Sequence, residues 1–116
     1  MKANRVVLRV SDPWDLGEAL KWQPLQGELV KTASDDHGGS ALIKLDKTIT
    51  YRDAAYRFVV ASPRLEGTVI STLETGKKVF CAFTGISDAN ADSANPFDTT
   101  GWRGGLGFIG DVEPEN

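Results

Sequence analysis

Apolar and polar side chains alternate with a period of two through most of the chain before residue 85. In the opening segment, Val6, Leu8 and Val10 fall on one face. Arg5 and Arg9 fall on the other, which is typical of a strand with one face buried. Related patterns predict strands at 5–10, 25–32, 43–51, 56–61, 68–73, 78–84 and 102–112. We therefore expect a mainly β protein, a small antiparallel barrel or sandwich of about six strands.

In two of these segments, the alternation also predicts which side chains share a face of the sheet. Strict alternation in segment 56–61 puts Tyr56, Phe58 and Val60 together on one face. Segment 78–84 is apolar on both faces, which predicts a central strand or a curled sheet whose outer side is partly covered. A closed form is favoured, because an open sheet of this composition would expose edge strands to self-pairing.

The only helix we expect is short and lies near residues 13–21. Asp12 can serve as its N-cap and Pro13 as its first residue, while Gly17 and Pro24 limit its length. At 116 residues the chain has the size of one domain. We expect a single β domain over residues 1–112 and a flexible tail at 113–116.

Charge and cysteine content limit the classes of partner and compartment. The formal net charge is −3, which disfavours nucleic acid as a partner, although scattered basic residues leave a local patch open. Cys81 is the only cysteine, which excludes an internal disulfide and favours the cytoplasm. No run of apolar residues is long enough to cross a membrane, so we expect a soluble protein.

A glycine pattern near the C-terminus resembles a dinucleotide-binding fingerprint in its letters alone. Gly105, Gly107 and Gly110 have the required spacing. The fingerprint functions only where a strand leads into a helix whose N-terminus holds the pyrophosphate, and too few residues follow for such a helix. A glycine-rich or bulged last strand is the better interpretation, and no cofactor is predicted.

A second motif spaces oxygen ligands as a calcium loop does. Asp88, Asn90 and Asp92 alternate, and Asp98 could reach the same ion from an irregular loop. Ser93 stands where such a loop needs glycine, and the acid expected at its twelfth position is missing. A polar turn whose side chains bond to their own backbone is favoured, and no metal site is predicted.

The remaining candidates are single residues rather than sets. His37, the only histidine, lies in the polar loop 34–40, and Cys81 lies in an apolar strand where thiols are usually inert. Arg64 can form an exposed ion pair with Glu66 or bind a carboxylate or phosphate. Trp102 is either packed or a contact for a partner, and no catalytic set converges.

The leading hypothesis is a non-catalytic binding module that displays loops 34–40 and 85–104 to a protein partner or to a second copy of itself. One alternative is a small-ligand or minor hydrolase site in the 85–104 loop. A weaker one is a nucleic-acid-binding barrel with exposed aromatic residues. The candidate surface residues are His37, Arg64, Asp88, Asp92, Asp98, Trp102 and Arg103.

Overall fold

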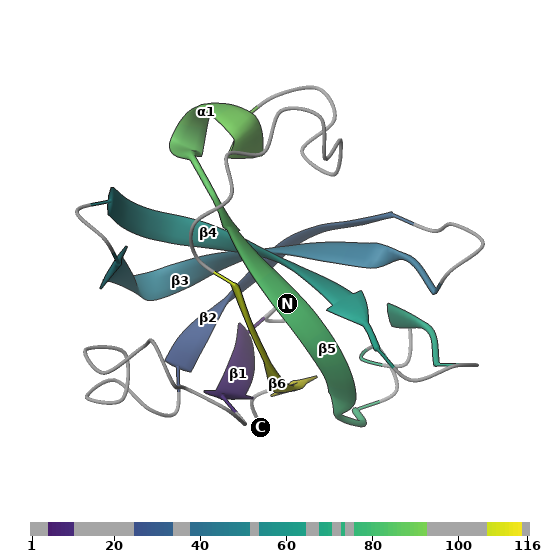
Figure 1. Ribbon diagram of the computed structural model, residues 1–116. Coiled ribbons are helices and arrows are strands. Elements are labelled where there is room, and N and C mark those ends of the chain that lie inside the picture. Colours follow the sequence, from purple (N-terminus) through teal and green to yellow (C-terminus); the bar gives the residue numbers. More distant parts are fainter. Residues whose placement is uncertain are drawn as a thin grey trace.

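The chain forms a closed barrel of six antiparallel strands (Figure 1). The computed structural model describes residues 5–10, 25–33, 38–51, 54–64, 68–70, 73, 76–92 and 107–114. Its elements are β1 (Arg5–Val10), β2 (Leu25–Ala33), β3 (Ser40–Tyr51), β4 (Ala54–Pro63), β5 (Val79–Ile86), α1 (Asp88–Ala91) and β6 (Gly107–Pro114). Each strand pairs with the next, and β6 returns to pair with β1. The mainly β prediction is confirmed, and of its two forms the barrel is the one that occurs.

The core fills the barrel with side chains from every strand. Alternate residues of each strand point inward, so the period-two pattern becomes one continuous apolar interior. The buried members of this interior are Val6, Leu8, Leu25, Ala41, Ile43, Leu45, Ile49, Val59, Ala61, Ile70, Leu73, Val79, Cys81, Phe83 and Val112. Their close packing makes the interior a core and not a lumen.

The alternation in β4 changes phase at Arg57. Phe58 packs against a cluster on the outside of the barrel, whereas Tyr56 packs against the interior. The β3–β4 register shifts at the same place, between Lys44 and Ile49 of β3. The prediction that Tyr56 and Phe58 share a face is therefore wrong, because an irregular register turns one of two neighbouring segments over.

A second irregularity lies in β2. The β2–β3 register shifts between Leu29 and Lys31, so Val30 is the additional residue in the strand. A bulged residue leaves the regular ladder, and the Val30 side chain is 50% exposed. This bulge explains why the alternation within residues 25–32 is weak in the sequence.

The strand predicted at 68–73 does not form in the described residues of that segment. Ile70 and Leu73 belong to 3₁₀ turns, and Thr68 and Val69 have no regular structure. Ile70 and Leu73 are both buried and belong to the core cluster. These two buried residues are three positions apart in the sequence and not two. The composition of so short a segment does not distinguish a strand from a turn.

The start of the predicted loop 85–104 has regular structure. Gly85 and Ile86 complete β5, and α1 then adds one helical turn. Glu113 and Pro114, predicted to belong to a tail, pair with Val7 and Val6 of β1. A flexible tail can thus only concern residues 115–116, which lie outside the described residues, as does the predicted helix at 13–21.

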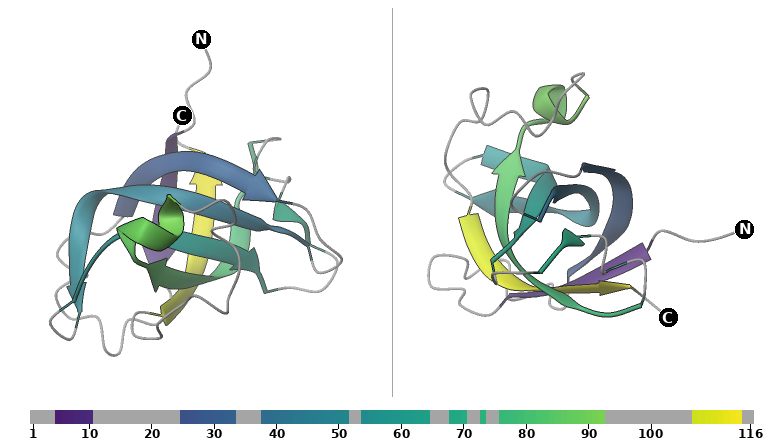
Figure 2. Two further views of the ribbon diagram at one scale, coloured as in Figure 1. Left: turned by 90° about the horizontal axis from the view of Figure 1, so that it is seen from above. Right: turned by 90° about the vertical axis from the view of Figure 1, so that its right-hand side faces the viewer.

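Figure 2 shows the strands curving around one another, with α1 outside the ring that they form. In the part of the chain that the structure describes, no helix has the length and apolar character needed to cross a membrane.

Candidate binding surface

The outer face of β3, β4 and β5 carries a second apolar cluster. Leu42, Val60 and Ile86 are almost fully buried there, and Phe58 and Ala91 pack against them. Leu42 and Val60 are cross-strand partners, which is why they share this face. Since Ala91 belongs to α1, the short helix is held on the barrel by this cluster, as its position in Figures 1 and 2 illustrates.

An ion pair also joins α1 to β4. Arg57 donates a hydrogen bond to the carboxylate of Asp88, the first residue of α1. This hydrogen bond, and then the negative charges of Asp88 and Asp92, raise the pKa of Arg57 above its ordinary value. Asp88 therefore already has a partner, and its contact fixes the end of β5 relative to the start of β4.

Residues 88–92, which have the ligand spacing of a calcium loop, form a helical turn in the structure. The Asp92 N–H donates to the Asp88 carbonyl oxygen at 3.0 Å, closing one turn. A calcium loop presents alternate oxygen ligands from a non-helical loop, so this turn differs from that geometry. Among the residues that the structure describes, no three His, Cys, Asp or Glu side chains are grouped to hold a metal ion.

Arg64 lies at the other end of β4 from this ion pair. Arg57 is near the start of β4, and Arg64 directly follows its last residue. Strand geometry separates the two by roughly 20 Å. The fold therefore does not bring Arg64 together with Asp88 or Asp92, and the predicted surface is divided into separate regions.

The end of loop 34–40 lies at the Arg64 end of the barrel. Gly38 has a φ of 97°, a conformation that favours glycine, and its carbonyl oxygen accepts a hydrogen bond from the Ile70 N–H at 2.7 Å. A Cβ at this position would come within 2.5 Å of the Thr68 carbonyl oxygen. This glycine thus allows two connections, β2–β3 and β4–β5, to approach closely.

Four predicted surface residues lie outside the described residues, and their placement stays a prediction: His37, Asp98, Trp102 and Arg103. The same holds for Glu66, the proposed ion-pair partner of Arg64.

Cys81 faces the core from β5. Burial, and then the nearby charge of Asp111, raises the pKa of the thiol to about 12. The thiol is therefore protonated at neutral pH, and a protonated, buried thiol is a poor nucleophile. This result agrees with the interpretation of Cys81 as a packing residue.

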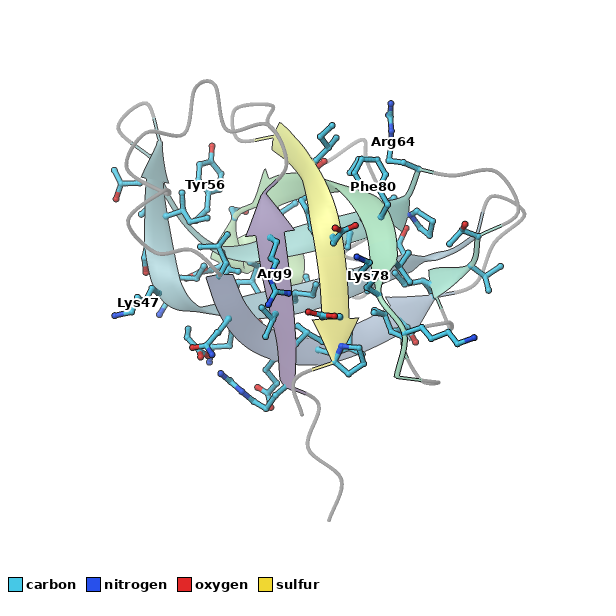
Figure 3. The ribbon with its side chains drawn as sticks, turned by 90° about the horizontal axis from the view of Figure 1, so that it is seen from below. Arg9, Lys47, Tyr56, Arg64, Lys78 and Phe80 are labelled. Carbon is cyan, nitrogen blue, oxygen red and sulfur yellow. The ribbon has the colours of Figure 1, made fainter. Side chains whose placement is uncertain are left out.

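Sequence reasoning missed a combination of residues around Phe80. The side chain of Phe80 is partly exposed on the outer face of β5. The Arg64 N–H donates to the Phe80 carbonyl oxygen at 3.0 Å, so Arg64 extends the β4–β5 ladder beside it. Figure 3 shows Arg64, Phe80 and Lys78 on the same side of the barrel, away from Lys47 and Tyr56. Alternation puts Phe80 on the face opposite to Cys81, but which of these faces is outward, and which residue neighbours Phe80 on β4, depend on the fold.

Two further ion pairs fix the short strand β1. Arg9 pairs with Glu113 of β6, across the contact that closes the barrel. Arg5 forms a two-pronged contact with Asp46 of β3, in which Nη1 lies 2.8 Å from Oδ1. This hydrogen bond from Arg5 lowers the pKa of Asp46. These pairs account for two arginines that otherwise would count as binding candidates.

No protein-family model, curated protein or solved structure gives a significant match to the chain.

Proposed function

We propose that this chain is a non-catalytic binding module that engages a protein partner or a second copy of itself. The observation that carries the proposal is the filled barrel, in which side chains of all six strands occupy the interior. A small barrel filled in this way offers its outer face and its connecting segments for binding. A cytoplasmic location belongs to the same proposal and is supported by the single, unpaired cysteine.

The described candidate residues lie far apart, which supports binding through a broad surface more than chemistry at one convergent site. Asp88 is occupied by Arg57, and Arg64 lies at the far end of β4. Loop 34–40 begins at the Arg64 end, whereas segment 85–104 begins at the end that carries α1. The described residues of the two segments, 38–40 and 85–92, therefore lie at opposite ends of the barrel.

The proposal is tested by light scattering after size-exclusion chromatography, combined with affinity capture from a lysate and identification of the captured protein. We expect either a dimer or stoichiometric retention of a defined protein. An unrelated small β-barrel coupled to the same resin is the control. A strict monomer that retains nothing beyond this control contradicts the proposal.

The small-ligand or hydrolase alternative depends on Asp88, Asp92 or Asp98 together with Arg103 or His37. Of these, the structure describes only Asp88, which Arg57 binds, and Asp92, and neither gives the alternative support. Thermal shift against divalent metals and a metabolite panel tests it, because a ligand that binds only the folded state raises the melting temperature. We expect no shift. A reproducible increase with one compound favours the alternative over the binding module.

A further inference from the structure

We infer that Phe80, flanked by Arg64 and Lys78, forms a docking patch for an acidic segment of a partner protein that carries an apolar side chain. The inference rests on the proposed binding function and names the chemistry of the partner. The term docking patch refers below to these three residues.

The geometry of the docking patch follows from the β4–β5 ladder. Ser62 pairs with Ala82 and Pro63 with Cys81, so Arg64 lies opposite Phe80. Directly opposed residues have Cβ atoms about 5 Å apart. Lys78 is two residues before Phe80 and about 7 Å from it along the chain, on the same face if the alternation of β5 continues. One aromatic ring is thus flanked by two positive charges.

Within the residues that the structure describes, the cations of the docking patch have no acidic partner. In the described part of the chain, neither Arg64 nor Lys78 has an ion pair with an acidic side chain, and the adjacent Lys77 has none either. Extending the β5–β6 register by one residue puts Glu113 opposite Lys78. That carboxylate is already bound by Arg9. Arg64 and Lys78 are both exposed, so an external anion can reach them.

Two acidic residues border the docking patch and limit the partner: Glu113, which Arg9 binds, and Asp111. Asp111 of β6 pairs with Phe80 and also with Arg9 of β1. A nucleic-acid strand needs a continuous cationic track and successive rings for stacking. Here the track is interrupted by a carboxylate, only one ring is present among these residues, and the whole chain has a net charge of −3.

A short acidic peptide matches this arrangement better. Its carboxylates can pair with the guanidinium fork of Arg64 and the ammonium group of Lys78. Its apolar side chain can cover the exposed part of the Phe80 ring, since aromatic residues are frequent anchors of protein interfaces. Opposite charges would mainly increase the association rate and select acidic partners.

The inference is tested by fluorescence anisotropy at low salt. The labelled peptide consists of glutamate and glycine residues around one leucine. We expect the double variant R64A/K78A to weaken binding by at least about tenfold, equivalent to about 1.4 kcal/mol. The matched control K47A removes a lysine charge outside the docking patch and should change affinity less than about twofold. Melting curves confirm that each variant is folded.

The role of the ring is tested separately. F80A should weaken binding of the leucine peptide, while F80L should retain most of it. Neither variant should alter binding of a peptide in which glycine replaces the leucine. Equal losses with both peptides would show that Phe80 only maintains the fold, and would overturn its assignment as an anchor.

Two outcomes with purified ligands overturn the inference as a whole, and a third comes from the lysate. One is equal peptide affinity in R64A/K78A, K47A and the unchanged chain. The other is tighter binding of a thymidine oligonucleotide of equal charge, with the same loss in R64A/K78A, which would identify a nucleic-acid surface. If a lysate protein is retained equally by the unchanged chain and by R64A/K78A, the binding module stands and the docking patch is refuted.

Discussion

Gly27 shows how one residue can limit strand spacing. It pairs with Leu45 in the β2–β3 ladder. A Cβ at this position would lie 2.6 Å from the Lys44 carbonyl oxygen and 3.0 Å from the Ile43 Cγ2. Both neighbours belong to the packed sheet, so an added methyl group requires the backbone to shift. The contact explains a glycine inside a strand, where glycine is otherwise unfavourable.

We therefore predict that Gly27→Ala destabilises the protein by about 1–3 kcal/mol, the range for overpacked sites. The matched control is Gly107→Ala, also within a strand, where the nearest atom to an added Cβ lies at 3.9 Å. Urea unfolding of both variants provides the comparison. Equal stability of the two variants would contradict the argument from close approach.

Cys81 is a single residue whose reactivity can report on unfolding. With a pKa of about 12, its thiolate population near pH 8 is about one part in ten thousand, and burial also blocks access. We predict that a thiol-reactive dye labels the protein only as fast as the barrel opens, and labels it fully in denaturant. C81A serves as the blank. Rapid stoichiometric labelling of the folded protein would show that the thiol is accessible.

The elements of the barrel are held together from outside as well as from within. Leu42 and Val60 face outward, where a half-buried strand normally has polar residues, yet both are almost fully buried. Ala91 of α1 and Ile86 at the end of β5 complete this cluster. The short helix thus stabilises the barrel by covering apolar surface and by the contact of Asp88 with Arg57.

Truncation of Leu42 tests the contribution of this outer cluster. We predict that Leu42→Ala lowers the free energy of unfolding by about 2–5 kcal/mol, as for a core residue. Lys44→Ala, on the same outer face of β3 but exposed, should change it by less than about 0.5 kcal/mol. Thermal or urea unfolding measures both. A loss below 1 kcal/mol in Leu42→Ala, about the effect of an average substitution, would mean that the cluster is loosely packed.

For the whole molecule, an ion pair between β1 and β3 links stability to pH. Asp46 has a lowered pKa in the folded state, chiefly because Arg5 donates a hydrogen bond to its carboxylate. A lowered folded pKa contributes stability at pH values above the unfolded pKa, and this contribution disappears as the pH falls through the folded pKa. The pair is partly exposed, at 36% and 40% for the two side chains, so its contribution is at most about 1 kcal/mol.

We predict that Asp46→Asn lowers stability at neutral pH and flattens the loss of stability on acidification below about pH 4. Urea unfolding of both proteins across that range gives the comparison. The Arg5→Gln variant should reproduce the effect, because it removes the other partner. If stability fell on acidification in both variants as it does in the unchanged chain, the pair would not contribute to stability.

The strands of the barrel and its apolar interior could largely be predicted from the sequence, although a strand was also predicted at 68–73, where none forms in the described residues. Period-two alternation places side chains on fixed faces without reference to other strands. Val6 and Leu8, predicted to share a face, both lie in the core. The extra residue at Val30 and the phase change at Arg57 could not be predicted, since a bulge exists only relative to a paired strand. The same applies to Ile70 and Leu73, whose spacing fits more than one local structure.

The candidate surface shows the same division between local pattern and long-range pairing. Alternation alone places Phe80 and Cys81 on opposite faces of their strand. Because both faces are apolar in sequence, only the fold decides that Cys81 faces the core and Phe80 the outside. The neighbours of Phe80 on β4 and β6 follow from register between strands distant in the chain, and so do the partners of Arg9, Arg5 and Arg57. Which arginines are paired within the fold, and which remain available for binding, depends on contacts between strands that no single segment encodes.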